Sequence, residues 1–136
     1  MAKAQTPRGS RPPIHLTEHD YDVISELAMR MEQRAPELAE QILDEVNRAR
    51  LHKDGALPKD VVAIGSEVEY LDGSTGERRR LTLVLPAEAD IEAGKISIMT
   101  PVGAGLIGMS VGREISWPTP DGRPRTFRIL EVNQQP

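Results

Sequence analysis

The residues with the most recognisable chemical spacing are the glycines of residues 103–108, which read Gly-Ala-Gly-Leu-Ile-Gly. Glycines spaced in this way let a backbone approach the pyrophosphate of a dinucleotide, provided that a strand precedes them and a full helix follows. The strand-like residues 96–99 do precede them, but Gly112 and the strand-like residues 114–117 follow almost at once. A crossover helix does not fit in that interval, so the motif does not predict nucleotide binding.

A second motif, His-Leu-Thr-Glu-His at residues 15–19, matches the H-x-x-E-H signature of zinc peptidases. That signature requires both histidines on one helix, whereas Thr17 is the type of residue that caps a helix start. His15 is then expected before the helix and His19 inside it, and His52 is the only other histidine. With no cysteine in the chain, thiolate metal sites and cysteine nucleophiles are excluded. We therefore expect no metal, no cofactor and no catalytic residue.

The charge balance favours a protein partner over nucleic acid. The 136 residues include 17 lysines and arginines against 21 aspartates and glutamates, a net charge of −4. A broad electrostatic grip on phosphates is not expected from this balance, so nucleic acid would be reached only indirectly, through a protein complex. The arginines at 78–80 are interpreted as a solvated strand start, with contact to RNA or an acidic protein surface as the alternative.

The elements that must position any site fall into three parts. Residues 1–13 are polar and rich in proline, without the apolar segment of a signal peptide, and predict a flexible tail. The chain has no apolar run of 18 residues, so we expect a soluble, cytoplasmic monomer that does not enter a membrane. Residues 14–57 predict an antiparallel hairpin of two helices, and residues 58–136 a mainly antiparallel β domain with one short helix near 104–108.

Local signals set the expected limits of the helices. Thr17 can cap the first helix with Asp20 as its capping-box partner, and Pro36 suits the first position of the second. Asp54-Gly55 and then Pro58 are expected to close the second helix. Apolar residues with helical spacing define the two buried faces, namely Tyr21, Ile24, Leu27, Ala28 and Met31, then Ala39, Ile42, Leu43, Val46 and Ala49.

We expect strands only from about Asp60 onward. Short β-type runs separated by turn residues lie at 61–64, 67–71, 81–85, 96–99, 114–117 and 126–132. Residues 118–122, Pro-Thr-Pro-Asp-Gly, predict the turn between the last two strands.

The order of parts and several local segments resemble the Gre transcript-cleavage factors. Residues 60–66 are similar to the start of the Gre C-terminal domain, 75–77 to its first hairpin and 96–112 to a strand, short helix and strand within it. The shorter relatives called regulators of nucleoside diphosphate kinase resemble the chain further, at residues 44–49, 81–86 and 99–104. The resemblance covers the chain from Ile14 to its end.

The resemblance implies a fold and a partner. Gre factors place an FKBP-like domain at the rim of the secondary channel of RNA polymerase, and a coiled coil reaches toward the active centre. Acidic residues at the coiled-coil tip hold a magnesium ion for RNA cleavage. A helix over 17–31 is only about 22 Å long, roughly half the Gre length. The tip residues Glu32, Arg34 and Glu37 do not reproduce the closely spaced Gre acids, and solvated helix-end charges are the alternative.

The expected role is therefore a bacterial transcription regulator that is not an enzyme. It would bind near the secondary channel and compete with Gre factors, with a cleavage-stimulating Gre factor as the alternative. The resemblance places the polymerase contact at residues 99–103, which are Met99, Thr100, Pro101, Val102 and Gly103. Met99, where Gre factors often have Asp or Asn, is either an apolar contact or a core residue. Prolyl isomerisation is disfavoured by only four aromatic residues, and an interaction module unconnected with polymerase stays open.

Overall fold

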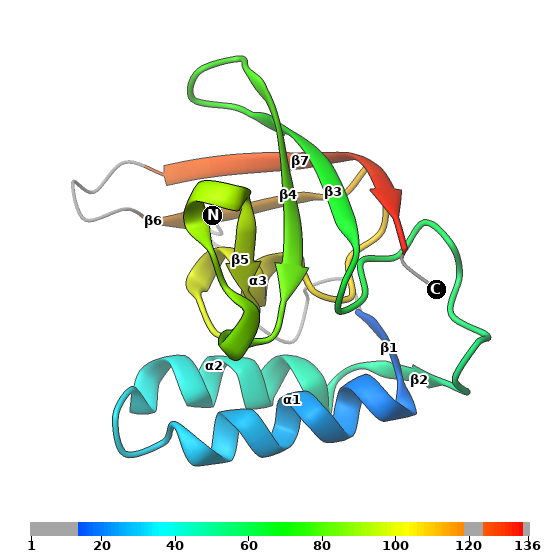
Figure 1. Ribbon diagram of the computed structural model, residues 1–136, viewed down its shortest axis with the longest axis vertical. Coiled ribbons are helices and arrows are strands. Elements are labelled where there is room, and N and C mark those ends of the chain that lie inside the picture. Colours follow the sequence, from blue (N-terminus) through cyan, green and yellow to red (C-terminus); the bar gives the residue numbers. More distant parts are fainter. Residues whose placement is uncertain (1–13, 119–123, 135–136) are drawn as a thin grey trace, which may run out of the picture.

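The computed structural model describes residues 14–118 and 124–134 (Figure 1). Within these residues a hairpin of two helices packs beneath a curled five-stranded sheet, so the chain is a mixed α+β protein as predicted. The expected tail at 1–13 and most of the expected turn at 118–122 lie outside the described residues. None of the described helices has the length and apolar character needed to cross a bilayer.

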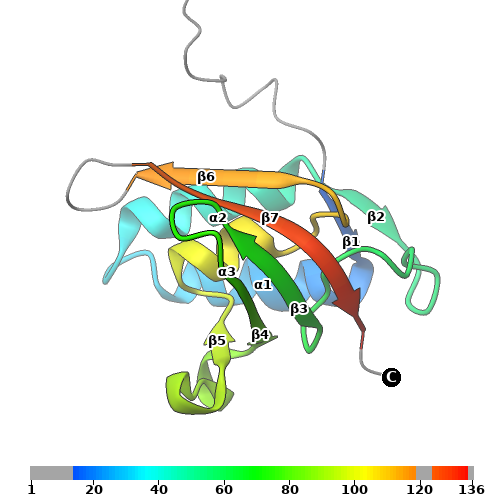
Figure 2. The same cartoon turned by 90° about the horizontal axis from the view of Figure 1, so that it is seen from above.

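Helices α1 (Glu18–Arg30) and α2 (Pro36–Asn47) lie side by side and antiparallel (Figure 1, Figure 2). The predicted cap is confirmed, because Thr17 Oγ1 accepts a hydrogen bond of 3.0 Å from the backbone N–H of Asp20. Pro36 occupies the first turn of α2 as predicted. The predicted end of α2 at Asp54-Gly55 is wrong, because the chain leaves the helix after Asn47 and enters a strand.

Two short strands at the start and end of the hairpin contradict the expectation that no strand precedes Asp60. Strand β1 (His15–Thr17) pairs in parallel with β2 (Arg50–His52), and Arg50 N–H donates to the Ile14 carbonyl at 2.8 Å. Leu16 in the middle of β1 is almost completely buried. Three residues are too few to show a recognisable alternation in sequence, which is why the prediction missed these strands.

The main sheet has the strand order β5-β4-β3-β7-β6. All its neighbours are antiparallel except β4 and β5, which are parallel, so the prediction of a mainly antiparallel domain is confirmed. Figure 2, which looks down on the sheet, shows its strands crossing above the helices. The strand bounds are β3 (Glu67–Asp72), β4 (Arg78–Val84), β5 (Lys95–Ser97), β6 (Glu114–Pro118) and β7 (Pro124–Asn133).

The expected strand at 61–64 does not form. Val61 makes only an isolated bridge to Ser110, while Val62 N–H donates to the Met109 carbonyl at 2.9 Å. Val61 and Val62 are both buried, so this segment is an irregular, fully enclosed crossing and not a strand with two different faces. Three short helices complete the β domain: the 3-10 turns η2 (Pro86–Glu88) and η3 (Ile91–Ala93), and the helix α3 (Pro101–Leu106).

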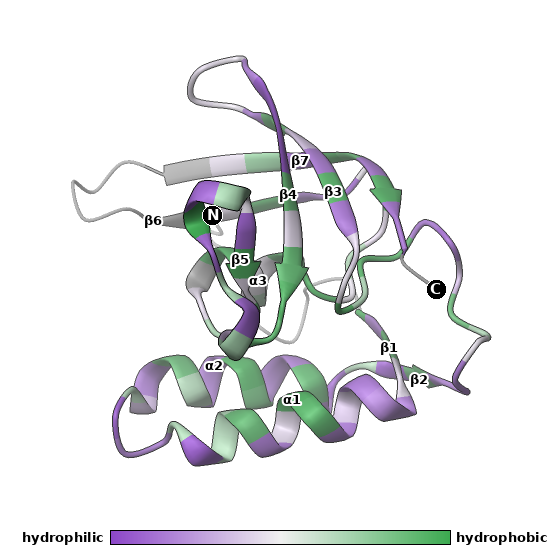
Figure 3. Cartoon of the chain, viewed as in Figure 1, coloured by the Kyte–Doolittle hydropathy of each residue, from purple (hydrophilic) through white to green (hydrophobic). Residues whose placement is uncertain are grey.

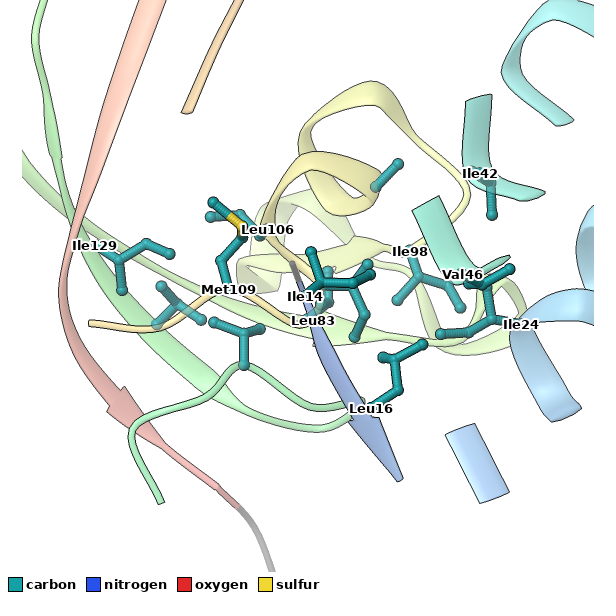
Figure 4. Close-up of a cluster of buried hydrophobic side chains, with 14 of the residues drawn as sticks. Ile14, Leu16, Ile24, Ile42, Val46, Leu83, Ile98, Leu106, Met109 and Ile129 are labelled. Carbon is teal, nitrogen blue, oxygen red and sulfur yellow. The ribbon is translucent and has the colours of Figure 1, made fainter. Parts of the chain in front are cut away.

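One continuous hydrophobic core joins the helices to the sheet. The predicted apolar face of each helix is buried at its centre, with Ile24 and Ala28 on α1 and Ile42 and Val46 on α2. Figure 4 draws residues from the helices together with residues of the β domain such as Leu83 and Ile98. Figure 3 shows the helices banded with apolar and hydrophilic residues, as expected for elements that bury one face. The hairpin is therefore joined to the β domain through this shared core.

The glycines of residues 103–108 serve close packing. A Cβ atom on Gly103 would overlap the backbone of Ser97, because α3 lies directly against the end of β5. Gly108 has φ +80°, a conformation that favours glycine, and a Cβ there would lie 2.7 Å from Cβ of Ile14. Because α3 has only six residues, no crossover helix follows these glycines. The glycine spacing of residues 103–108, which matches a dinucleotide-binding motif, is thus explained by close backbone contacts inside the domain.

Candidate functional site

The predicted contact residues 99–103 lie in the turn between β5 and α3, and hydrogen bonds hold this turn closely. Ser97 Oγ accepts from Met99 N–H at 2.9 Å. Thr100 Oγ1 donates to the Ser97 carbonyl at 2.8 Å and accepts from Gly103 N–H at 3.1 Å, so it caps α3. The polar groups of Thr100 therefore fix the shape of the turn, and any contact with a partner falls mainly to its neighbours.

The side chains of this turn are only partly available at the surface. Met99 and Val102 are half-buried and pack against the hydrophobic core, and Gly103 is buried. Gly103 can therefore influence a partner only through the backbone shape that it permits. The side chain of Pro101 lies outside the described residues. The sequence left open whether Met99 is an apolar contact for a partner or a core residue. In the structure, Met99 packs against the core and is also partly exposed.

A hollow of about 340 Å³ adjoins this turn and was not found by sequence reasoning. Tyr70 from β3 and Phe127 from β7 stack in its wall, with ring centroids 4.3 Å apart and planes inclined by 24°. Val102 lines the hollow as well as belonging to the predicted contact turn, so it connects the two surfaces. The lining residues are Tyr70, Arg79, Arg80, Leu81, Ile91, Gly94, Ile96, Val102 and Phe127.

Ile91 is the most exposed large apolar residue among those described, with 81% of its surface accessible. It lies on η3, on the hollow's edge, between the acidic residues Asp90 and Glu92 in the sequence. An isolated apolar residue in an acidic, exposed segment was the sequence signal that could have drawn attention to this region. Together with the aromatic wall it contributes apolar surface to a hollow whose lining is about equally polar and apolar.

The arginines at the start of β4 give the hollow a basic rim. Arg79 pairs with Glu77 at 2.7 Å, and Arg80 lies 3.6 Å from Glu67 and 3.9 Å from Glu69. The three side chains at 78–80 are exposed, in agreement with their interpretation as a solvated strand start. Because Arg79 and Arg80 have acidic neighbours already, their charge is partly compensated at the rim.

The predicted hairpin tip is exposed and lies at the end of the helices far from β1 and β2 (Figure 1). Glu32, Arg34 and Glu37 are all exposed. The turn is closed by a hydrogen bond of 2.8 Å from Ala35 N–H to the Met31 carbonyl. Nowhere among residues 14–118 and 124–134 do three histidine or acidic side chains gather in a way that could hold a metal ion. The tip therefore presents separate surface charges.

The base of the hairpin holds a pair of histidines that the sequence did not predict. His15 Nδ1 and His52 Nε2 lie 3.0 Å apart, brought together by the parallel pairing of β1 and β2. His19 lies inside α1, so the prediction that the H-x-x-E-H histidines do not share a helix is confirmed. Burial, followed by the nearby His52 and Arg50, lowers the pKa of His15 below its ordinary value.

Asp20 plays a different part from the capping-box partner expected. Its side chain is almost fully buried, and Oδ2 accepts a hydrogen bond of 3.3 Å from the backbone N–H of Ile64. Burial raises the pKa of this carboxyl, and the Ile64 N–H opposes that rise in part. Asp20 therefore connects the first turn of α1 to the loop that opens the β domain, 44 residues later in the chain.

Comparison with known proteins identifies relatives over most of the chain. The family model described as "Transcription elongation factor, GreA/GreB, C-term" matches residues 57–134. The regulator of nucleoside diphosphate kinase of Escherichia coli (strain K12) is 35% identical over 93% of each chain. Transcription elongation factor GreA of Flavobacterium johnsoniae is 34% identical over 85% of this chain and 70% of its own.

A solved structure shares the fold. It is described as a prokaryotic transcription elongation factor GreA/GreB from Nitrosomonas europaea, is 34% identical and has a TM-score of 0.74. The match covers 88% of this chain and 98% of that one, so the helices and the sheet are included together.

Proposed function

Because the chain belongs to the GreA/GreB family of transcription factors, we propose that it is a transcription regulator that binds RNA polymerase near the secondary channel. It competes there with Gre-type factors without stimulating RNA cleavage and without an enzymatic activity of its own. The observation that carries this proposal is the near full-length similarity to a regulator of nucleoside diphosphate kinase.

We further propose that the polymerase contact combines residues 99–103 with the adjoining hollow. Val102 belongs to both, and the stacked Tyr70 and Phe127 offer an apolar wall beside it. Exposed Ile91 gives the same surface a large apolar side chain that nothing in the fold requires. In this arrangement the FKBP-like β domain docks at the channel rim, and the hairpin, as a short coiled coil, occupies the channel entrance.

Reach and chemistry support the proposed lack of cleavage stimulation. Helix α1 has 13 residues, which is about 20 Å at 1.5 Å per residue. Glu32 and Glu37 are separated by Arg34, whose charge opposes the binding of a cation between them. The proposed role is therefore occupation of the channel, with no chemistry at the polymerase active centre.

Binding of the purified protein to core RNA polymerase, with and without competing GreA, tests the proposal. Met99→Asp should weaken binding about thirtyfold, equal to about 2 kcal/mol, and Ile91→Asp should weaken it about tenfold. Met29→Asp is the matched control, because Met29 on α1 is 56% exposed and lies outside the proposed surface. If Met29→Asp alone abolishes binding, the docking surface lies on the helices. Thermal melting of each variant verifies that it is folded.

A backtracked elongation complex separates the proposal from the alternative of a Gre-type cleavage factor. The protein should not accelerate magnesium-dependent RNA cleavage. Acceleration that disappears in Glu32→Ala or Glu37→Ala would instead establish the alternative, which the similarity to GreA sequences keeps in view. The aromatic hollow also calls for a proline-turnover assay on a model peptide, in which we expect no activity.

A further inference from the structure

We propose that His15 and His52 form a proton-sensitive latch at the base of the hairpin, which ties β1 to β2 near neutral pH and releases them when both imidazoles are protonated. This inference does not depend on polymerase binding, because it concerns how the hairpin is attached to the β domain. It rests on a contact between the two rings, on the place of that contact in the fold and on the charges around it.

The contact itself limits the number of protons. His15 Nδ1 and His52 Nε2 lie 3.0 Å apart, a hydrogen-bond distance, with ring centroids 5.2 Å apart. One of the facing nitrogens must donate and the other accept, so at least one ring is neutral while the bond exists. In a doubly protonated pair both nitrogens carry a proton, the bond is lost and two positive charges are brought close together.

The position of the pair makes its rupture consequential. His15 lies in β1, and its backbone N–H donates to the Gly108 carbonyl at 2.9 Å. Arg50 N–H on β2 donates to the Ile14 carbonyl at 2.8 Å. Strand β1 thus contacts β2 on one side and the segment after α3 on the other, directly before α1 begins. Loosening β1 releases the chain segment that connects the hairpin to the β domain.

The surrounding charges mostly oppose a second proton. Burial is the main cause that lowers the pKa of His15, followed by His52, Arg50 and, more weakly, Arg113, whereas Asp60 acts in the opposite sense. On the neighbouring α1, the backbone N–H of His19 donates a 3.2 Å hydrogen bond to Oδ1 of Asp54 in the loop after β2. Burial raises the pKa of Asp20 on α1, and this residue is unchanged in every variant used below.

The direction of the pH effect follows from proton counting. Because the folded chain binds a proton at His15 less readily than the opened chain, stability is fully present above the ordinary imidazole pKa of about 6.5. It is lost as the pH falls below that value. One extra proton on the opened form raises the opening constant by up to about tenfold between pH 7.5 and pH 5.5.

Amide hydrogen exchange measures this opening locally. The reporters are the N–H groups of His15 and Arg50, whose bonds to Gly108 and Ile14 close the latch. In the parent protein their opening constants, corrected for intrinsic exchange, should rise by up to about tenfold from pH 7.5 to pH 5.5. In His52→Gln the rise should be smaller than in the parent, because a glutamine amide removes the opposing charge of His52 while the burial of His15 remains.

The chain supplies its own control. His19→Gln removes an exposed histidine from α1, four residues from His15, and should leave the parent's pH dependence intact. Titration of the imidazole signals provides a second readout, in which the midpoint of His15 should rise in His52→Gln and stay unchanged in His19→Gln. If His52→Gln does not fold, titration of the imidazole signals in the parent and in His19→Gln still tests the latch.

Four results would overturn the proposal. The first is equal opening of the parent at pH 7.5 and pH 5.5, and the second is an undiminished pH dependence in folded His52→Gln. The third is loss of that dependence in His19→Gln, which would assign the effect to the exposed helix histidine. The titration of His15 at an ordinary midpoint in the parent would likewise remove the charge coupling on which the latch depends.

Discussion

The two ends of the helical hairpin are built in opposite ways. The hairpin base, residues 14–20 and 46–52, is fixed by a parallel strand pair, the His15–His52 contact and the partly buried hydrogen bond from Ile64 N–H to Asp20. The hairpin tip, residues 31–37, has exposed charges and the hydrogen bonds of a single turn. The difference indicates that the base determines where the hairpin points, whereas the tip determines only what it presents.

The sharpest prediction at the base uses two leucines that face each other across β1 and β2. Leu16 is 1% exposed and its register partner Leu51 is 48% exposed. Leu16→Ala should lower the free energy of unfolding by about 3 kcal/mol, since it leaves a cavity between the hairpin and the β domain. Leu51→Ala should change it by less than about 0.5 kcal/mol. Urea denaturation measures both, and equal effects would mean that the base is not packed as described.

Asp20 gives the next largest effect. Asp20→Ala leaves the partly buried Ile64 N–H without its acceptor and should cost about 2 kcal/mol in urea denaturation at neutral pH. Asp20→Asn keeps an oxygen acceptor and avoids burying a charge. A loss in Asp20→Asn as large as that in Asp20→Ala would show that the charge itself stabilises the fold.

The pH dependence of that variant has a definite sign. Because the folded-state pKa of Asp20 is raised, its contribution to stability is fully present below the ordinary carboxyl pKa of about 4 and is lost as the pH rises through the folded value. Asp20→Asn should therefore lose less stability than the parent as the pH rises from 4 to 7. Unfolding curves at several pH values measure this, and parallel pH profiles would contradict it.

The cap at Thr17 should have a smaller effect. Thr17→Ala removes the side-chain acceptor for Asp20 N–H and should cost about 1 kcal/mol of unfolding free energy. Thr17→Ser retains a hydroxyl and should recover most of that loss. Chemical denaturation with a helix-sensitive circular dichroism signal distinguishes them, and identical stabilities for alanine and serine would show that the cap bond contributes nothing.

The tip should give the smallest effect. Glu32→Ala and Glu37→Ala, singly or together, should change the unfolding free energy by less than about 0.5 kcal/mol, because both side chains are exposed. Thermal melting and urea denaturation measure this. A loss above about 1 kcal/mol would mean that the tip acids help to hold the hairpin, and the contrast between the two ends would disappear.

The sequence predicted the local signals of the hairpin better than its strand pairing, for a physical reason. The cap at Thr17 and the start at Pro36 are local signals, decided by residues within one turn, and both are confirmed. The pairing of β1 with β2 depends on contacts between residues 35 positions apart, and no pattern within three residues reveals it. The same is true of His15 and His52, which are unremarkable until the strands align them.

In the β domain, too, features decided by local residues were predicted and those that depend on distant contacts were not. Strands with alternating burial, such as β3, were predicted almost to the residue, because one face meets the core and the other meets solvent. The segment at Val61 and Val62 was misread as a strand, since its apolar residues are buried on all sides and lack a partner strand. The hollow beside Val102 could not be foreseen, because Tyr70 and Phe127 meet only through the pairing of β3 with β7.

The strand pair at the base also allows the hairpin to change in length while the β domain stays the same. Its two connections to the rest of the molecule, β1 and β2, pair with each other from His15–Arg50 to Thr17–His52, so the chain segment between them is closed by this strand pair. Seven residues added to each helix would lengthen it by about 10 Å and keep the same face toward the core over two turns. The distance that the tip reaches is thus a quantity that insertions and deletions can set independently, without rebuilding the domain that carries the hairpin.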